Sequence, residues 1–247
     1  MRSVILATLL VACSHSAYAS WQGNWLVGVS GIYAQRRGEL DLSMRYVPPF
    51  PVATPVFPIL EADNLYTNKG FGWGLLAGYQ LKSDGWTWGF EGSVDWHDIT
   101  ATRDVVFTDV IGLFSWDATS RYEREPIAAL SGRMAYEMAP YFIPYMRLGI
   151  EGSHDSLDVT VTGNPFILVQ PNISVSDSRW NWHYLAGIGI ETPLLCTQAS
   201  VRIEYNYHSR GRPLIVNGIF INQGVSFSSE MHNRTHSGKL SLVWNFS

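Results

Sequence analysis

This chain of 247 residues has few charges, only two cysteines and no long apolar run after its N-terminal region. Asp, Glu, Lys and Arg make up 15% of it, whereas soluble domains average about 25%. The formal net charge of −4, with Lys and Arg scattered along the chain, excludes a basic surface for nucleic acid. No later stretch approaches the roughly 18 apolar residues of a membrane-spanning helix, so a helical span is excluded.

The N-terminus has the features of an export signal. Arg2 supplies a positive charge, Val4 to Ala12 form a short apolar run, and Ala17-Tyr-Ala19 is a small-x-small cleavage site. We therefore expect a signal peptide at residues 1–19 and a single mature β domain at 20–247. Processing at Cys13, as in a lipoprotein, is an open alternative. If cleavage follows Ala19, Cys196 is the only cysteine left and no internal disulfide can form.

What the chain does have is alternation of apolar and polar residues, the period of a strand with two unlike faces. The clearest example is a hairpin, in which Phe71 to Leu81 and Trp86 to Trp96 flank the turn signal Lys82-Ser-Asp-Gly85. The pattern predicts eight strands, at about 25–33 (with a possible continuation to 46), 71–81, 86–97, 128–138, 146–151 (continuing polar to 158), 180–191, 201–208 and 240–246.

The charges within these strands lie on the face opposite the aromatic and aliphatic one. These residues are Glu91, Arg133, Glu137, Arg147, Glu151, Arg202, Glu204 and Lys239. A soluble barrel would turn them outward and a membrane barrel inward, and periodicity alone does not choose. Aromatics near the strand ends, Gly and Ser on the charged face, and an alternating last strand favour the membrane. The sequence predicts an all-β fold, an eight-stranded antiparallel transmembrane β-barrel with short periplasmic turns, long extracellular loops and these charges as a network in its lumen.

Two of the expected loops are unusually apolar. The Pro48–Lys69 segment contains Phe50, Val52, Val56 and several prolines, and the Leu214–Ser229 segment contains Ile215, Val216, Ile219, Phe220 and Ile221. Either the strands extend above the membrane as a β-rich rim, or the loops form an ordered contact surface. We favour the contact surface.

Candidate catalytic and metal-binding residues are few. Polar residues predicted near the outer ends of strands, Asp95, His97, Asp98, His154-Asp155 and His208-Ser209, could converge at a rim site, but such residues are ordinary in a barrel. His183, His208, His232 and His236 lack the short paired spacing of a metal site. We expect no catalysis, no metal and no cofactor.

On this pattern the whole mature chain resembles the small OmpA/OmpX-type outer-membrane β-barrel proteins. The resemblance implies that the barrel assembly machinery recognises the last strand through Leu240, Leu242, Trp244 and Phe246, although Ser247 departs from the family's terminal Phe. It also implies ion pairs across the lumen. The function expected is that of a structural or adhesin-like surface protein, monomeric in outer-membrane lipids, that contacts a host-surface or matrix ligand through its loops. A small channel, and a rim-sited protease or acyltransferase, are the alternatives.

Overall fold

The computed structural model describes residues 22–46, 60–97, 99–108, 115–124, 126–163, 172–194, 197–220 and 225–246. The predicted signal peptide, Cys13, the prolines from Pro48 to Pro58, Asp98 and Cys196 lie outside these ranges. The described part contains no helix that is long and apolar enough to cross a membrane.

The described residues form eleven strands in one antiparallel sheet. They are β1 (Gln22–Tyr46), β2 (Leu60–Ser83), β3 (Trp86–His97), β4 (Ala101–Thr108), β5 (Ser115–Arg124), β6 (Ile127–Tyr136), β7 (Ile143–Gly163), β8 (Asn172–Pro193), β9 (Ala199–His208), β10 (Leu214–Phe220) and β11 (Val225–Phe246).

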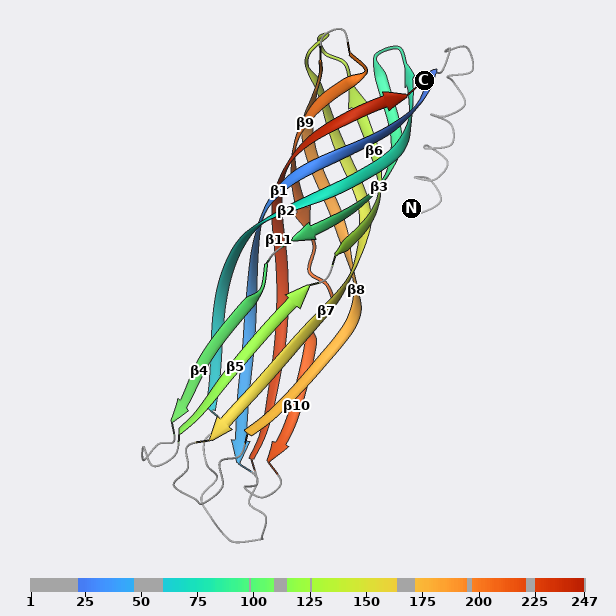
Figure 1. Ribbon diagram of the computed structural model, residues 1–247. Coiled ribbons are helices and arrows are strands. Elements are labelled where there is room, and N and C mark those ends of the chain that lie inside the picture. Colours follow the sequence, from blue (N-terminus) through green and yellow to red (C-terminus); the bar gives the residue numbers. More distant parts are fainter. Residues whose placement is uncertain are drawn as a thin grey trace, which may run out of the picture.

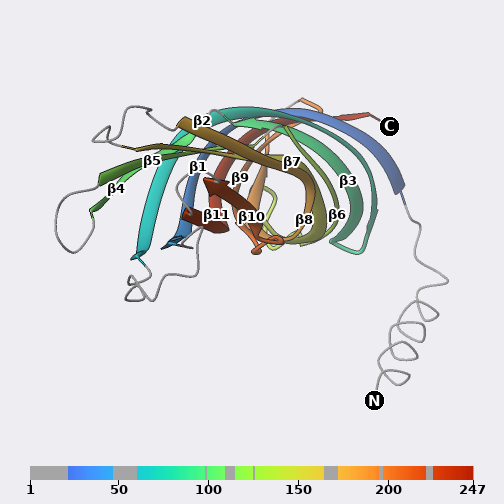
Figure 2. The same ribbon diagram turned by 90° about the horizontal axis from the view of Figure 1, so that it is seen from below.

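Eight of these strands close into a ring. The order is β1-β2-β3-β6-β7-β8-β9-β11, and β11 returns to β1 with Trp25 opposite Phe246 (Figures 1 and 2). The predicted eight-stranded antiparallel barrel is confirmed. The predicted tight turn after β2 is also present, with Asp84 and Gly85 at φ of 50° and 80°, the conformation of a type I′ hairpin turn.

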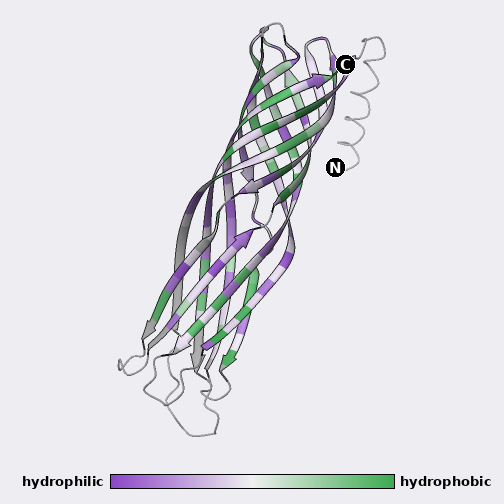
Figure 3. Ribbon diagram, in the orientation of Figure 1, coloured by the Kyte–Doolittle hydropathy of each residue, from purple (hydrophilic) through white to green (hydrophobic). Residues whose placement is uncertain are grey.

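The half of the barrel that holds the C-terminus and the tight turns is apolar outside and polar inside. On β1 the outward side chains Trp25, Val29 and Tyr33 are 65%, 53% and 44% exposed, while Ser30 between them is buried. At about 3.3 Å per residue and a tilt near 40°, this apolar band is roughly 20–25 Å tall. Figure 3 shows it as alternating green and purple along each strand.

Beyond this band the strands continue and the alternation changes phase. On β7, Met146, Leu148 and Ile150 face outward, whereas past Asp155 the outward positions are polar and the inward ones are apolar. On β1 the outward Arg37 and Glu39 likewise alternate with buried Leu40 and Leu42. From Gln35 to Tyr46 this extension rises roughly 25–30 Å along the barrel axis.

The extension is two four-stranded sheets facing each other. One sheet is β4-β5-β7-β8 and the other is β10-β11-β1-β2, since β4 pairs only with β5 and β10 only with β11 among the described strands. The apolar core between them comes from both sheets: Leu40, Leu42, Leu214, Val216, Phe227 and Met231 from one, and Ala118, Tyr122, Leu157, Val159 and Val161 from the other. Aligned sheets packed this way resemble the interior of a soluble β-sandwich.

Where the structure describes them, the long extracellular loops predicted from the sequence are strands. Residues 60–69 belong to β2, residues 214–220 and 225–229 to β10 and β11, and the polar stretch after residue 100 contains β4 and β5. Leu214, Val216 and Phe227 are buried in the core of the extension, so the contact-surface interpretation is wrong for these residues and the β-rich rim is the correct one. The reversed phase of the alternation made these strands look like loops.

Candidate functional site

The structure brings seven of the eight predicted lumen charges inside the barrel. Glu91, Arg133, Arg147, Glu151, Arg202, Glu204 and Lys239 are all buried. Glu137 is the exception. It follows the end of β6, is 31% exposed, and accepts a 2.5 Å hydrogen bond from Lys82 Nζ near the turn after β2. That expectation was wrong because sequence alternation does not mark where a strand leaves the lumen.

Arg202 on β9 links carboxylates from two other strands. Its Nη1 lies 2.7 Å from Glu91 Oε1 on β3, and its Nε lies 3.1 Å from Glu191 Oε2 on β8. Glu191 also pairs with Arg133 of β6, whose guanidinium stacks 4.3 Å from the centre of the Tyr145 ring. These contacts tie β3, β6, β8 and β9 together across the lumen.

A second group is centred on Arg147 of β7. Its Nη1 lies 3.2 Å from Glu204 Oε1, and its other nitrogens donate to Ser93 and Ser131. The other oxygen of Glu204 accepts a 3.0 Å hydrogen bond from the Tyr145 hydroxyl. Every part of the Arg147 guanidinium therefore has a partner, as a buried charge requires.

Lys239 of β11 and Asp95 of β3 complete this layer, with Nζ 2.8 and 2.7 Å from the two carboxylate oxygens. Four carboxylates (Asp95, Glu91, Glu191 and Glu204) then face four cations (Arg133, Arg147, Arg202 and Lys239), which gives a formal charge of zero. The lumen of the apolar band is occupied by this neutral, cross-linked set of ion pairs together with a small apolar cluster of Leu26, Leu76 and Val243.

Two acidic members of this layer were not among the predicted network residues. Asp95 was assigned to the rim, and Glu191 was left out although it alternates with Ile188 and Ile190. The same alternation that placed Glu91 and Glu204 on the inward face would also have placed Asp95 and Glu191 there.

A second polar layer lies where the ion pairs meet the apolar core of the extension. Arg124 of β5 contacts Glu151 at 3.2 Å and Asp155 at 3.3 Å, and its Nε donates a 2.7 Å hydrogen bond to Ser153. Asp155 lies beyond the apolar band. Burial alone would raise its pKa, but contacts with His183 and Arg124 outweigh burial and lower that pKa to about 2. Burial likewise raises the pKa of Tyr122 to about 12.

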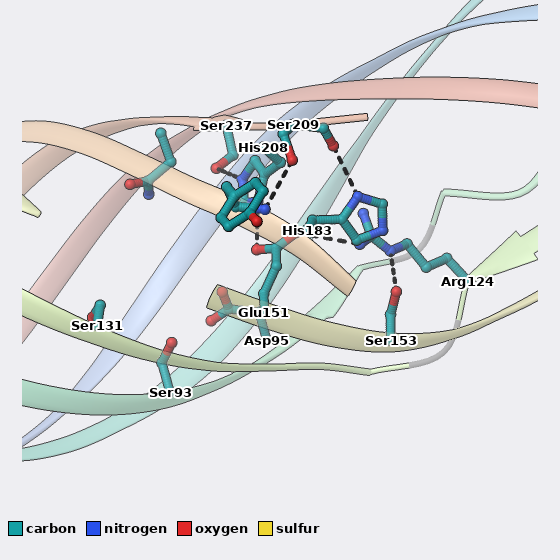
Figure 4. A network of polar contacts seen from close by, with 12 residues as sticks. Ser93, Asp95, Arg124, Ser131, Glu151, Ser153, His183, His208, Ser209 and Ser237 are labelled. Carbon is teal, nitrogen blue, oxygen red and sulfur yellow. Dashed lines mark hydrogen bonds and ion pairs between the residues drawn. The ribbon is translucent and has the colours of Figure 1, made fainter. Parts of the chain in front are cut away.

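Within this layer three side chains form a chain of contacts from three strands (Figure 4). Ser237 Oγ of β11 lies 3.0 Å from His208 Nε2 of β9, and His208 Nδ1 lies 2.6 Å from Glu151 Oε2 of β7. A nucleophile, a base and an acid that orients the base are the parts of a serine hydrolase triad. Ser237 and His208 are only 3% and 4% exposed, so neither side chain reaches the surface in this conformation.

The other predicted rim residues do not form one open site. His154 faces outward beside the Trp180 ring, while His183 is buried and its Nδ1 lies 2.8 Å from the backbone oxygen of Ser209. His97 lies at the end of β3 and is partly buried. In the described ranges, no three His, Cys, Asp or Glu side chains are grouped so that they could hold a metal ion.

Comparison with known proteins identifies the family. A model of the outer membrane protein beta-barrel domain matches residues 4–246. The chain belongs to this family. The apolar band is thus the part of the outer-membrane barrel that faces lipid, and its sandwich-like extension projects from the bacterial outer membrane. No curated protein sequence matches the chain significantly.

Several solved outer-membrane barrels are similar to it at low identity. Ail of Yersinia pestis shares 13% identity over 84% of this chain and 98% of its own, with a TM-score of 0.28. The outer-membrane protease OmpT of Escherichia coli shares 10% over 90% and 97%, with a TM-score of 0.42. Neisserial surface protein A shares 9% over 83% and 95%, with a TM-score of 0.27.

The last strand of the outer-membrane barrel has the orientation that the sequence predicts. Leu240, Trp244 and Phe246 face outward and are 58%, 45% and 47% exposed, and Leu242 shares their parity. This strand closes the ring, since β11 pairs with both β1 and β9.

Proposed function

We propose that this protein is a closed, non-conducting outer-membrane barrel that presents its outer end for surface interaction, as an adhesin-like or structural protein. The observation that carries this proposal is that the interior has two fillings of opposite polarity. Ion pairs occupy the part within the membrane, and apolar side chains occupy the part above it.

Neither filling favours passage of a solute. An eight-stranded barrel is just wide enough for its own side chains to fill, and the inward residues Glu91, Arg147 and Arg202 are each 2% exposed. In the extension, the inward Leu157, Val159 and Val161 are 0% exposed. A hydrated ion would have to break buried ion pairs and then cross a layer of aliphatic side chains, so a small channel is the less supported alternative.

The extension provides a support for surface interaction. β1, β2, β7, β8 and β11 continue past the apolar band, and the strand ends that bracket residues 47–59, 109–114, 164–171 and 221–224 lie at its far end. Paired backbone and a packed core make this a rigid support, on which connecting segments are free to vary and to bind. We include in the proposal a monomeric state, recognition of Leu240, Leu242, Trp244 and Phe246 by the barrel assembly machinery, and a host-surface or matrix ligand.

Conductance tests the closed lumen. The refolded full chain in a planar bilayer should give no steady ionic current. A matched pair of variants tests whether the apolar side chains of the extension block ion passage. Val159→Gly with Leu157→Gly removes side chains from the core of the extension. Ser156→Gly with Asp158→Gly removes the same number of side chains from its outer face. Steady current from the unmodified protein would refute the proposal.

Loop replacement tests the surface role. Residues 47–59 should be exchanged for a Gly/Ser segment of equal length, which leaves β1 and β2 complete. The adhesion of cells that display the unmodified or the replaced protein should then be measured on immobilised matrix glycoproteins and on epithelial cells. Replacement should leave the amount of folded barrel nearly unchanged, because loop closure entropy is set mainly by length and the length is kept, and should reduce adhesion. Equal adhesion after replacement of all four segments would refute the role.

Hydrolysis is a second candidate, favoured by the Ser237–His208–Glu151 contacts. A fluorophosphonate probe incubated with the refolded protein should label Ser237 if the serine is activated and reachable. We expect no labelling, because both Ser237 and His208 are buried. Labelling that is lost in His208→Ala would make the protein a hydrolase.

A further inference from the structure

Just above the apolar band, the outer surface carries a cluster of cations, Arg37 of β1, Lys69 of β2 and Arg234 of β11. All three side chains are exposed and face outward. Arg37 is directly opposite Arg234 in the register of β1 and β11. Lys69 is opposite Gln35, which places it diagonally next to Arg37. Typical spacings between Cβ atoms are about 5 Å for the direct pair and roughly 7–8 Å for the diagonal one.

The charges of this cationic cluster are not balanced within the described part of the chain. None of its members lies within ion-pair distance of a carboxylate there. The nearest outward acid along β1, Glu39, instead lies 3.9 Å from Arg210. Like charges directly opposite each other on neighbouring strands destabilise a sheet, so an external anion would relieve this repulsion.

The height of the cluster points to the source of that anion. Phe71, 75% exposed, is the next outward residue after Lys69 on β2, and Tyr33, 44% exposed, precedes Gln35 and Arg37 on β1. Aromatic side chains at the end of a lipid-facing band mark the headgroup level of a membrane. The cluster therefore begins where lipid headgroups lie, on the outward side of the barrel.

We propose that Arg37, Lys69 and Arg234 form a binding site for the phosphate groups of a phosphorylated outer-leaflet lipid. Guanidinium groups bind phosphate with paired hydrogen bonds, and lysine adds a point charge. The acyl chains of the same lipid would pack on the apolar band beside Phe71 and Tyr33. This inference rests on membership of the outer-membrane family and is independent of the proposed surface role.

The test measures binding of diphosphoryl lipid A to the refolded full chain in neutral detergent micelles, by thermophoresis. Arg37→Ser with Arg234→Ser removes two cations from the cluster. Lys82→Ser with Arg121→Ser is the matched control, because it removes two exposed cations that already pair with Glu137 and Glu123. A cation near an anionic lipid surface is worth about a fivefold change in affinity. The cluster variant should bind roughly twenty-five-fold more weakly, and the control should bind like the unmodified protein.

Three further arms separate the possible outcomes. Lipid A without phosphates should bind the unmodified protein and the cluster variant equally and weakly, and inorganic phosphate at millimolar concentration should not displace diphosphoryl lipid A. If the double variant does not refold, Arg234→Gln alone should give about a fivefold loss. The proposal is overturned by equal losses in cluster and control variants, by undiminished binding of dephosphorylated lipid, or by full displacement by free phosphate.

Discussion

Replacing Arg147 with methionine should expose how strongly the lumen depends on its ion pairs. The guanidinium of Arg147 is 2% exposed and contacts Glu204, Ser93 and Ser131. Methionine fills a similar volume but leaves the Glu204 carboxylate without its cation. Breaking a buried pair by removing one partner costs about 3–5 kcal/mol. Tyr145 and Asn206 still donate hydrogen bonds to Glu204, so we expect the lower end of this range.

The measurement is urea unfolding of the refolded protein in phospholipid vesicles, followed by tryptophan fluorescence. A second substitution isolates the charge: Arg147→Met with Glu204→Gln should be more stable than Arg147→Met alone, because no unpaired charge stays buried. Arg121→Met is the control, since the Arg121–Glu123 pair is 59% and 43% exposed and such pairs contribute about 1 kcal/mol or less. If Arg147→Met and Arg121→Met unfold at the same urea concentration, the lumen is not a packed, low-dielectric interior.

Three other predictions concern the core of the extension, the dependence of stability on pH and the assembly of the barrel in cells. Val159→Asp should open the extension to trypsin on intact cells and destabilise it by several kcal/mol, as an unpaired charge in an apolar core does, whereas the outward Ser156→Asp should change neither. Asp155, whose pKa is lowered to about 2, should contribute roughly 2–3 kcal/mol above its unfolded pKa near 4; this contribution is lost as the pH falls through about 2, and Asp155→Asn should remove that dependence from acid unfolding curves. Phe246→Ser should reduce the amount of folded barrel in cells without changing refolding of the purified chain into detergent, and equal losses in both assays would indicate a stability defect instead.

The sequence alone determined the architecture of the membrane part because strand alternation is a local property. Side chains two residues apart share a face, so Trp25, Val27 and Val29 had to face the same medium, and Glu91 had to face away from Phe90. Scarce charge and aromatic strand ends then favoured lipid as that medium. These signals were enough to place eight strands and to assign seven of the eight charges to the interior.

The extension could not be recognised in this way, because its strands reverse the phase without changing the period. Leu40 and Leu42 lie on the inward face of β1, like Ser30 and Arg36 earlier in the same strand, and only the facing sheet makes that position apolar. Read without its partner, the segment is a polar stretch with scattered aliphatic residues. Tertiary structure sets the medium on each side of a strand. That medium decides whether the residues that face it are apolar or polar.

The pairing of the buried charges likewise belongs to the tertiary structure. Arg202 and Glu91 are 111 positions apart in the sequence, and Ser237, His208 and Glu151 come from three different strands. The alternation along a strand shows that such residues face inward. It does not show their height along the barrel axis, because that height depends on the stagger of each strand pair around the ring. The partners in each ion pair, and the contact between Ser237 and His208, are therefore fixed only when the last strand pairs with the first.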